Sequence, residues 1–164
     1  MTNLDYMLKK GILILGIGNE ILSDDAIGPR LVKDLERRTK RKDIEFLTSS
    51  NGGLEIMEYL YGFKQVIFVD GIRSSGTKPG HVFHFVPSDF RETSNLSNLH
   101  DVNFITALTL GKILEPEFHS DLHIIAVEII EDREFSERLT PFLEKLYPEI
   151  LEKVEAEIRQ IING

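Results

Sequence analysis

The segment GILILGIGNEILSDDAIGPR, residues Gly11–Arg30, decides the fold of this chain. Its first residues, Gly11–Leu15, form an unbroken apolar run, which is typical of a strand covered on both faces. The stretch Gly16–Asn19 then permits a tight turn and positive φ angles. A helical pattern follows, because apolar residues recur with a spacing that buries one stripe, at Ile27, Leu31 and Leu35. The turn therefore lies above the carboxyl end of a core strand, where open α/β sheets place their functional sites.

Strand-like runs recur along the rest of the chain, at Ile44–Leu47, Val66–Val69, His81–Val86 and Leu122–Val127. Helical patterns lie between most of them, at residues 54–60, 104–113 and 150–161, with Pro148 in the first turn of the last helix or at a break. The alternation predicts a three-layer α/β/α sandwich around a five-stranded, mostly parallel, twisted sheet. The link 71–80 has no helical pattern, so we expect it to return directly to a neighbouring strand as one antiparallel pair. No boundary is visible, and residues 1–164 are predicted to form a single domain.

Composition excludes several classes of function. The chain of 164 residues has no cysteine, which excludes disulfides, thiolate metal sites and a cysteine nucleophile. Its formal charge of −8 argues against nucleic-acid binding, which requires a basic face. No apolar run approaches a membrane span, and the first ten residues lack the apolar core of a signal peptide. A monomeric cytoplasmic protein with no membrane partner is expected.

Acidic side chains occur at two predicted edge positions. Asp24 and Asp25 stand at the start of a helix, where aspartates cap free N–H groups, and we assign Asp24 to capping or local turn bonding. Glu20 is interpreted as a solvated loop residue. Asp70 follows the apolar run of residues 65–69 and precedes Gly71. An Asx-turn would explain Asp70, but a carboxylate after so apolar a strand needs a partner, and a functional role is favoured.

One of the five histidines differs from the others in its setting. His100 precedes a predicted helix, is followed by Asp101 and lies in a polar stretch. The remaining four are interpreted as ordinary surface or core residues: His81, His84, His119 and His123. The first two point to opposite faces of one strand and so cannot form a ligand pair.

Several segments in order resemble the hydrogenase maturation proteases, a family that trims the carboxyl-terminal tail of a nickel-containing hydrogenase large subunit. The resembling segments are GIGNEILSDDAIG (16–28), SNGGLE (50–55), IFVDGI (67–72), PG (79–80), LHD (99–101) and LTP (139–141). The resemblance implies that Asp25, Asp70 and His100 are the metal ligands and catalytic residues of an aspartyl-type or metal-dependent peptidase. Asn98 and Leu99 depart from the family, in which many members carry a small hydroxyl residue.

Two carboxylates and an imidazole suit nickel, zinc, manganese or cobalt. The resemblance favours nickel that is supplied by the substrate, and it implies that the partner is a nickel-loaded large-subunit precursor. Two rival functions stay open. The first is a non-catalytic nickel-checking or assembly protein. The second is a small α/β nucleotide-binding enzyme, although Ile21 replaces the third glycine of a dinucleotide fingerprint. The motifs G-x-S-x-G and H-E-x-x-H are absent.

Overall fold

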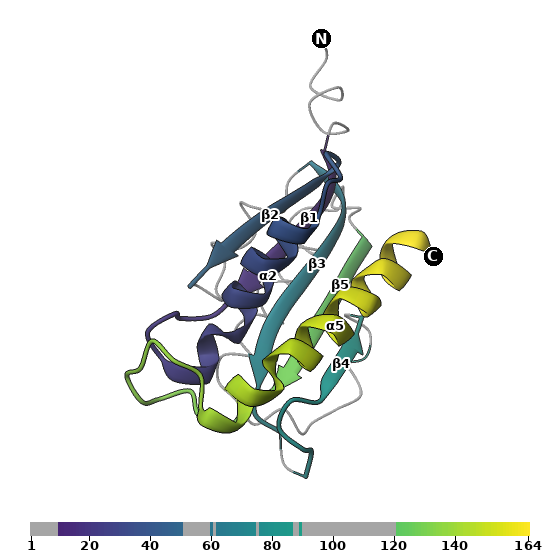
Figure 1. The fold of residues 1–164 in the computed structure, drawn as a ribbon. Coiled ribbons are helices and arrows are strands. Elements are labelled where there is room, and N and C mark those ends of the chain that lie inside the picture. The colour runs from purple at the N-terminus through teal and green to yellow at the C-terminus, as the bar shows by residue number, and fades with distance from the viewer. Residues whose placement is uncertain (1–9, 51–59, 61, 75, 87–88, 90–120) are drawn as a thin grey trace.

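The structure is a computed structural model that describes residues 10–50, 60, 62–74, 76–86, 89 and 121–164. It contains a five-stranded sheet in the order β2-β1-β3-β5-β4 (Figure 1). All five predicted strands are confirmed, and their bounds are β1 Lys10–Ile17, β2 Ile44–Ser49, β3 Phe63–Ile72, β4 Val82–Phe85 and β5 Asp121–Glu128. Strands β2, β1, β3 and β5 are parallel to one another, and β4 is antiparallel to β5. The predicted α/β class with a mostly parallel sheet is therefore confirmed.

The antiparallel pair differs in one respect from the expectation. The link after β3 was predicted to return to a neighbouring strand, but β5 lies between β3 and β4 in the sheet. The link therefore crosses the carboxyl end of β5, and the backbone N–H of Gly80 donates to the carbonyl oxygen of Glu128 at 2.7 Å. The sequence pattern identified the direction of β4 but not the strand that β4 pairs with.

Two long helices, α2 Ile27–Arg38 and α5 Pro141–Asn163, lie on the same face of the sheet (Figure 1). A short 3₁₀ helix, η1 Ser23–Ala26, precedes α2. The final helix predicted at residues 150–161 is confirmed, but the placement of Pro148 in its first turn or at a break is wrong, because α5 begins at Pro141 and continues through Pro148. Leu143 and Tyr147 are buried ahead of the proline, so the apolar stripe begins earlier and its packing outweighs the lost backbone bond. The other predicted helices, at 54–60 and 104–113, lie outside the described residues except for Leu60.

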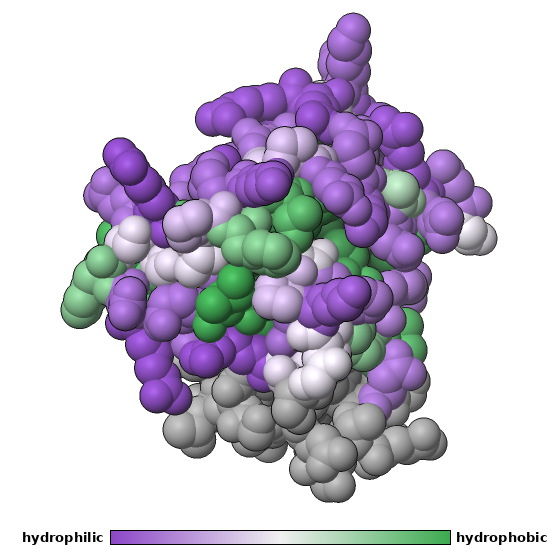
Figure 2. All heavy atoms as spheres, turned by 60° about the horizontal axis from the view of Figure 1, so that its bottom comes forward, coloured by the Kyte–Doolittle hydropathy of each residue, from purple (hydrophilic) through white to green (hydrophobic). Residues whose placement is uncertain are grey.

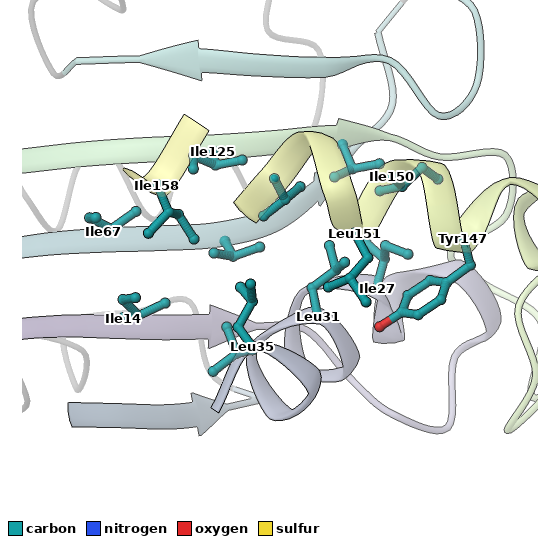
Figure 3. Close-up of a cluster of buried hydrophobic side chains, with 14 of the residues drawn as sticks. Ile14, Ile27, Leu31, Leu35, Ile67, Ile125, Tyr147, Ile150, Leu151 and Ile158 are labelled. Carbon is teal, nitrogen blue, oxygen red and sulfur yellow. The ribbon is translucent and has the colours of Figure 1, made fainter. Parts of the chain in front are cut away.

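Apolar side chains fill both faces of the sheet. One cluster joins α2 and α5 to alternate residues of the central strands, including Ile14, Ile67 and Ile125 (Figure 3). The intervening strand residues form a second cluster on the opposite face with Leu60. Burial on both faces explains why these strands read as unbroken apolar runs. In the part of the chain that the structure describes, no helix combines the length and the apolar character needed to cross a bilayer.

Candidate functional site at the carboxyl edge of the sheet

The glycines of the opening segment hold the first turn of α2 directly against the ends of two strands. A Cβ on Gly28 would stand 2.4 Å from the carbonyl oxygens of both Ile17 and Val69. Gly18 has φ +147°, and a Cβ there would stand 1.9 Å from the carbonyl oxygen of Asp25. Larger residues at either position would push the turn away from the sheet. The turn that contains Asp25 is thereby fixed above the carboxyl ends of β1 and β3.

Asp25 is half-buried and held in place by its own turn. The backbone N–H of Asn19 donates to Asp25 Oδ2 at 2.7 Å, and the Asn19 side chain accepts a bond from the N–H of Ile21 at 3.2 Å. Such bonds orient a carboxylate in the way that outer-shell partners orient metal ligands. Glu20 in the same turn is exposed and pairs with Lys33, as expected for a solvated loop residue.

Asp24 is fully buried, and its partners are distant in the sequence. Its Oδ1 accepts the N–H of Thr140 at 2.7 Å. Its Oδ2 accepts the N–H groups of Ile130 and Glu131 and the hydroxyl of Thr140 at 3.0–3.1 Å. Neither η1 nor α2 has a side-chain cap bond at its start. The structural role predicted for Asp24 is confirmed, but local capping is wrong, because these donors come from a segment more than 100 residues away.

Asp70 lies inside β3, two residues before the strand ends at Ile72. It is half-buried, and its Oδ1 accepts the N–H of Gly71 at 2.8 Å, a local bond of the kind that starts a loop. Alternation along the strand places Asp70 on the face of Phe68, away from α2 and α5. Gly71 lies on the opposite face of the sheet, close to α2, since a Cβ at this position would lie 3.1 Å from Ile27 Cγ2.

The structure brings two of the three predicted site residues to one edge of the sheet. Asp25 lies in the turn after β1, and Asp70 lies near the end of the adjacent strand β3, whose Val69 is paired with Gly16. His100 lies outside the described residues, as do Gly52, Gly53 and His119. Within the described residues, no group of three or more His, Asp or Glu side chains is placed to hold a metal ion. Convergence of Asp25, Asp70 and His100 on one ion therefore stays a prediction.

Three other histidines are described, and one of them, His81, lies at this edge, where its carbonyl oxygen accepts the N–H of Glu128 at 2.9 Å. His84 and His123 face each other across β4 and β5, with His84 Nε2 at 2.9 Å from His123 Nδ1. His123 Nε2 is also 3.0 Å from Asp121 Oδ2. His81 is exposed and lies edge-on against Phe83. His81 and His84 thus have separate partners, in agreement with their predicted separation.

Sequence analysis missed Glu128, a second buried carboxylate at the same edge. Glu128 ends β5 and is 3% exposed. Its two oxygens accept the N–H and the hydroxyl of Ser74 at 2.8 and 2.7 Å. These bonds fasten the link between β3 and β4 to the end of β5. The signal was present in the sequence, because Glu128 follows an apolar run just as Asp70 does.

A hollow of about 550 Å³ opens between the first turns of α2 and α5. Arg30 lies on its wall and makes two hydrogen bonds to the Glu144 carboxylate, at 2.8 and 2.7 Å. These bonds lower the pKa of Glu144 below its ordinary value of 4.5. The remaining lining residues belong to the segment that Asp24 holds and to the start of α5: Glu137, Arg138, Leu139 and Pro141.

Comparisons with known proteins agree on one family. A family model described as hydrogenase maturation protease matches residues 29–159. The hydrogenase 2 maturation protease of Escherichia coli K12 is 32% identical over 154 residues, which are 91% of each chain. The solved hydrogenase maturating endopeptidase HybD from E. coli has a TM-score of 0.72 at 30% identity, covering 91% of this chain and 92% of that chain. A [NiFe] hydrogenase maturation protease from Thermococcus kodakarensis, at 22% identity and covering 88% and 97%, shares the fold with a TM-score of 0.68.

Proposed function

This chain belongs to the hydrogenase maturation protease family, and from this premise we propose that it is the endopeptidase that removes the C-terminal peptide of a nickel-loaded hydrogenase large-subunit precursor. Asp25, Asp70 and His100 are proposed to engage the metal. The observation that supports the proposal best is the placement of Asp25. The turn holds this half-buried carboxylate over the ends of β1 and β3, in the same edge region as Asp70.

The donor set fits a divalent ion that arrives with the substrate. One oxygen of Asp25 and one oxygen of Asp70 accept backbone N–H groups, which fixes the direction of each carboxylate. Carboxylates with an imidazole suit nickel and similar divalent ions, and the chain has no thiolate that would retain such an ion tightly. A nickel ion bound in the precursor supplies Lewis-acid chemistry at the scissile bond. The residues of this chain orient that ion and the peptide beside it.

The test is a cleavage assay on the large-subunit precursor of the source organism, prepared with and without nickel. The released C-terminal peptide is detected by mass spectrometry. We expect the peptide only from the nickel-loaded precursor. A nickel-loaded precursor that binds the protein but stays intact would contradict the peptidase role and support the checking or assembly protein instead.

A further inference from the structure

The exposed large hydrophobic side chains of the described residues gather in two segments. Ile21 lies in the turn before η1, and the others lie in the loop after β5 or in the first turn of α5. These four residues, which we call the edge patch, are Ile21, Ile130, Phe135 and Phe142, with exposed fractions of 48%, 37%, 82% and 52%. Figure 2 turns this end of the molecule forward and shows hydrophobic surface among hydrophilic residues. Apolar side chains gathered at one place on a surface indicate an interaction site.

The two segments of the edge patch are joined by backbone bonds. The N–H of Ser136 donates to the carbonyl oxygen of Ile21 at 3.0 Å, and the N–H of Ser23 donates to the carbonyl oxygen of Ser136 at 2.8 Å. The buried Asp24 carboxylate adds its four bonds to Ile130, Glu131 and Thr140. The edge patch is therefore built on a bonded frame, so a partner that docks there need not order the loop first.

The edge patch is continuous with the candidate site. Ile21 belongs to the turn that Asn19 fastens to Asp25. Asp24, which directly precedes Asp25, accepts the N–H of Glu131 in the loop that contains Phe135. The hollow at Arg30 adjoins the same loop, since Leu139 and Pro141 line it next to Phe142. A protein that presents a peptide to Asp25 would therefore lie beside the turn of Ile21 and the loop bonded to it.

We propose that the edge patch is the docking surface for the folded body of the hydrogenase large-subunit precursor, and this inference rests on the proposed function. Under the proposed function the tail of a large protein substrate reaches Asp25, so contact area beside the site adds affinity that the tail does not supply. Exposed aromatic side chains provide large contact area at small entropic cost, and Phe135 is the most exposed of the four. Contacts made equally before and during cleavage lower KM and leave kcat unchanged.

The experiment compares the full-length variants Phe135→Ser and Phe135→Leu in cleavage of the nickel-loaded precursor. Phe135→Ser is expected to raise KM by roughly tenfold with kcat within about twofold, as for loss of an interface anchor. Phe135→Leu, which retains an apolar side chain, should recover most of the affinity. Lys153→Ser is the control, because Lys153 is exposed on α5 about three turns beyond Phe142 and should leave both constants unchanged. Melting temperatures should agree among all variants.

The outcomes separate the docking surface from the proposed function. An unchanged KM in Phe135→Ser, or a loss confined to kcat, would overturn the docking surface while wild-type cleavage upheld the peptidase. If the wild-type protein does not cleave, interferometry with the immobilised precursor decides. If the wild-type protein binds the precursor and Phe135→Ser binds it more weakly, the docking surface is supported without the peptidase role. If the wild-type protein does not bind, the docking surface is overturned. A wild-type dimer that Phe135→Ser dissociates, with KM unchanged, would assign the edge patch to self-association and overturn the proposal.

Discussion

At the scale of single residues, Asp24 and Asp25 are neighbours whose surroundings differ completely. Asp24 is fully buried and accepts four hydrogen bonds from the loop after β5. Asp25 is half-buried and accepts a bond from the backbone of Asn19 in its own turn. Burial with many donors is typical of a carboxylate that supports the fold, and partial exposure at an edge is typical of one that meets a substrate.

Matched substitutions should separate these two roles. Asp24→Asn replaces one acceptor oxygen by a donor that faces N–H groups, and it is expected to lower the free energy of unfolding by roughly 2–4 kcal/mol. Asp25→Asn leaves one oxygen that can accept the Asn19 N–H, so the stability should change little. Because the variant loses the proposed metal-binding charge, it should not process the precursor. Urea unfolding and the precursor cleavage assay measure the two effects. Full stability in Asp24→Asn would contradict the role assigned to its four bonds.

Asp70→Asn tests the second proposed ligand. The amide oxygen can still accept the N–H of Gly71, so the end of β3 should keep its shape. Removal of a half-buried charge should leave the melting temperature unchanged or slightly raised. Processing of the nickel-loaded precursor should be lost. A variant that processes the precursor at the wild-type rate would remove Asp70 from the site.

Sequence reasoning located Asp24, Asp25 and Asp70 at this edge but missed Glu128. The argument that favoured Asp70, an acid after an apolar strand, applies equally to Glu128, which the structure shows bonded to Ser74. The structural role predicted for Asp24 is confirmed, but its donors lie more than 100 residues away, and no local pattern encodes that distance. Local patterns thus find acids at strand ends, and tertiary partners decide what each acid does.

At the scale of elements, α2 and α5 are joined by a buried stripe and a polar border. Leu31 and Leu151 belong to the shared core (Figure 3). At the border, Arg30 bonds to Glu144 and lies 3.9 Å above the centre of the Tyr147 ring. Tyr147 is buried and donates its hydroxyl to Asp34 Oδ2 at 2.7 Å; burial and this bond raise its pKa. The polar contacts fix how the two helices lie against each other.

The Arg30–Glu144 pair should make the stability of the fold decrease slightly at acid pH. Because Arg30 lowers the pKa of folded Glu144, the pair stabilises the fold above about pH 4.5, and this stability is lost as the pH falls through the folded pKa. Glu144→Gln should therefore melt slightly below the wild type at pH 7, and the difference should shrink as the pH falls below about 4.5. Both groups are substantially exposed, so the difference should be small and should shrink in high salt. Calorimetry from pH 3 to 7 measures the difference in melting temperature. A difference that stays constant over this range would contradict the stabilising effect of the Arg30–Glu144 pair.

The elements themselves were largely predictable from the sequence. The strands were identified because burial on both faces makes continuous apolar runs such as Ile12–Leu15. The start of α5 was not identified from the sequence. Pro148 was given more weight than the buried positions Leu143 and Tyr147 that precede it. The partner of β4 was also missed, since pairing between distant strands depends on packing of the whole sheet.

At the scale of the whole molecule, the proposed chemistry predicts that the protein alone binds metal weakly. Two carboxylates and an imidazole without a thiolate make a weak site, so the purified protein should contain far less than one equivalent of metal. The nickel-loaded precursor would bring its own ligands and complete the coordination. Elemental analysis of the purified protein measures the metal content. Stoichiometric zinc, together with equal cleavage of nickel-free precursor, would contradict recognition of substrate nickel.

The place of β5 between β3 and β4 also has a consequence for biosynthesis. On the ribosome, β3 and β4 are made before β5, yet each is hydrogen-bonded to β5 in the finished sheet. Among the described strands, β4 is hydrogen-bonded only to β5, and this pair cannot form until residues 121–128 have been translated. A nascent chain that stalls before this point exposes the unpaired edges of β3 and β4, which are sites for aggregation. The described sheet therefore cannot be completed before β5 has been translated, whatever the order in which its other strands form.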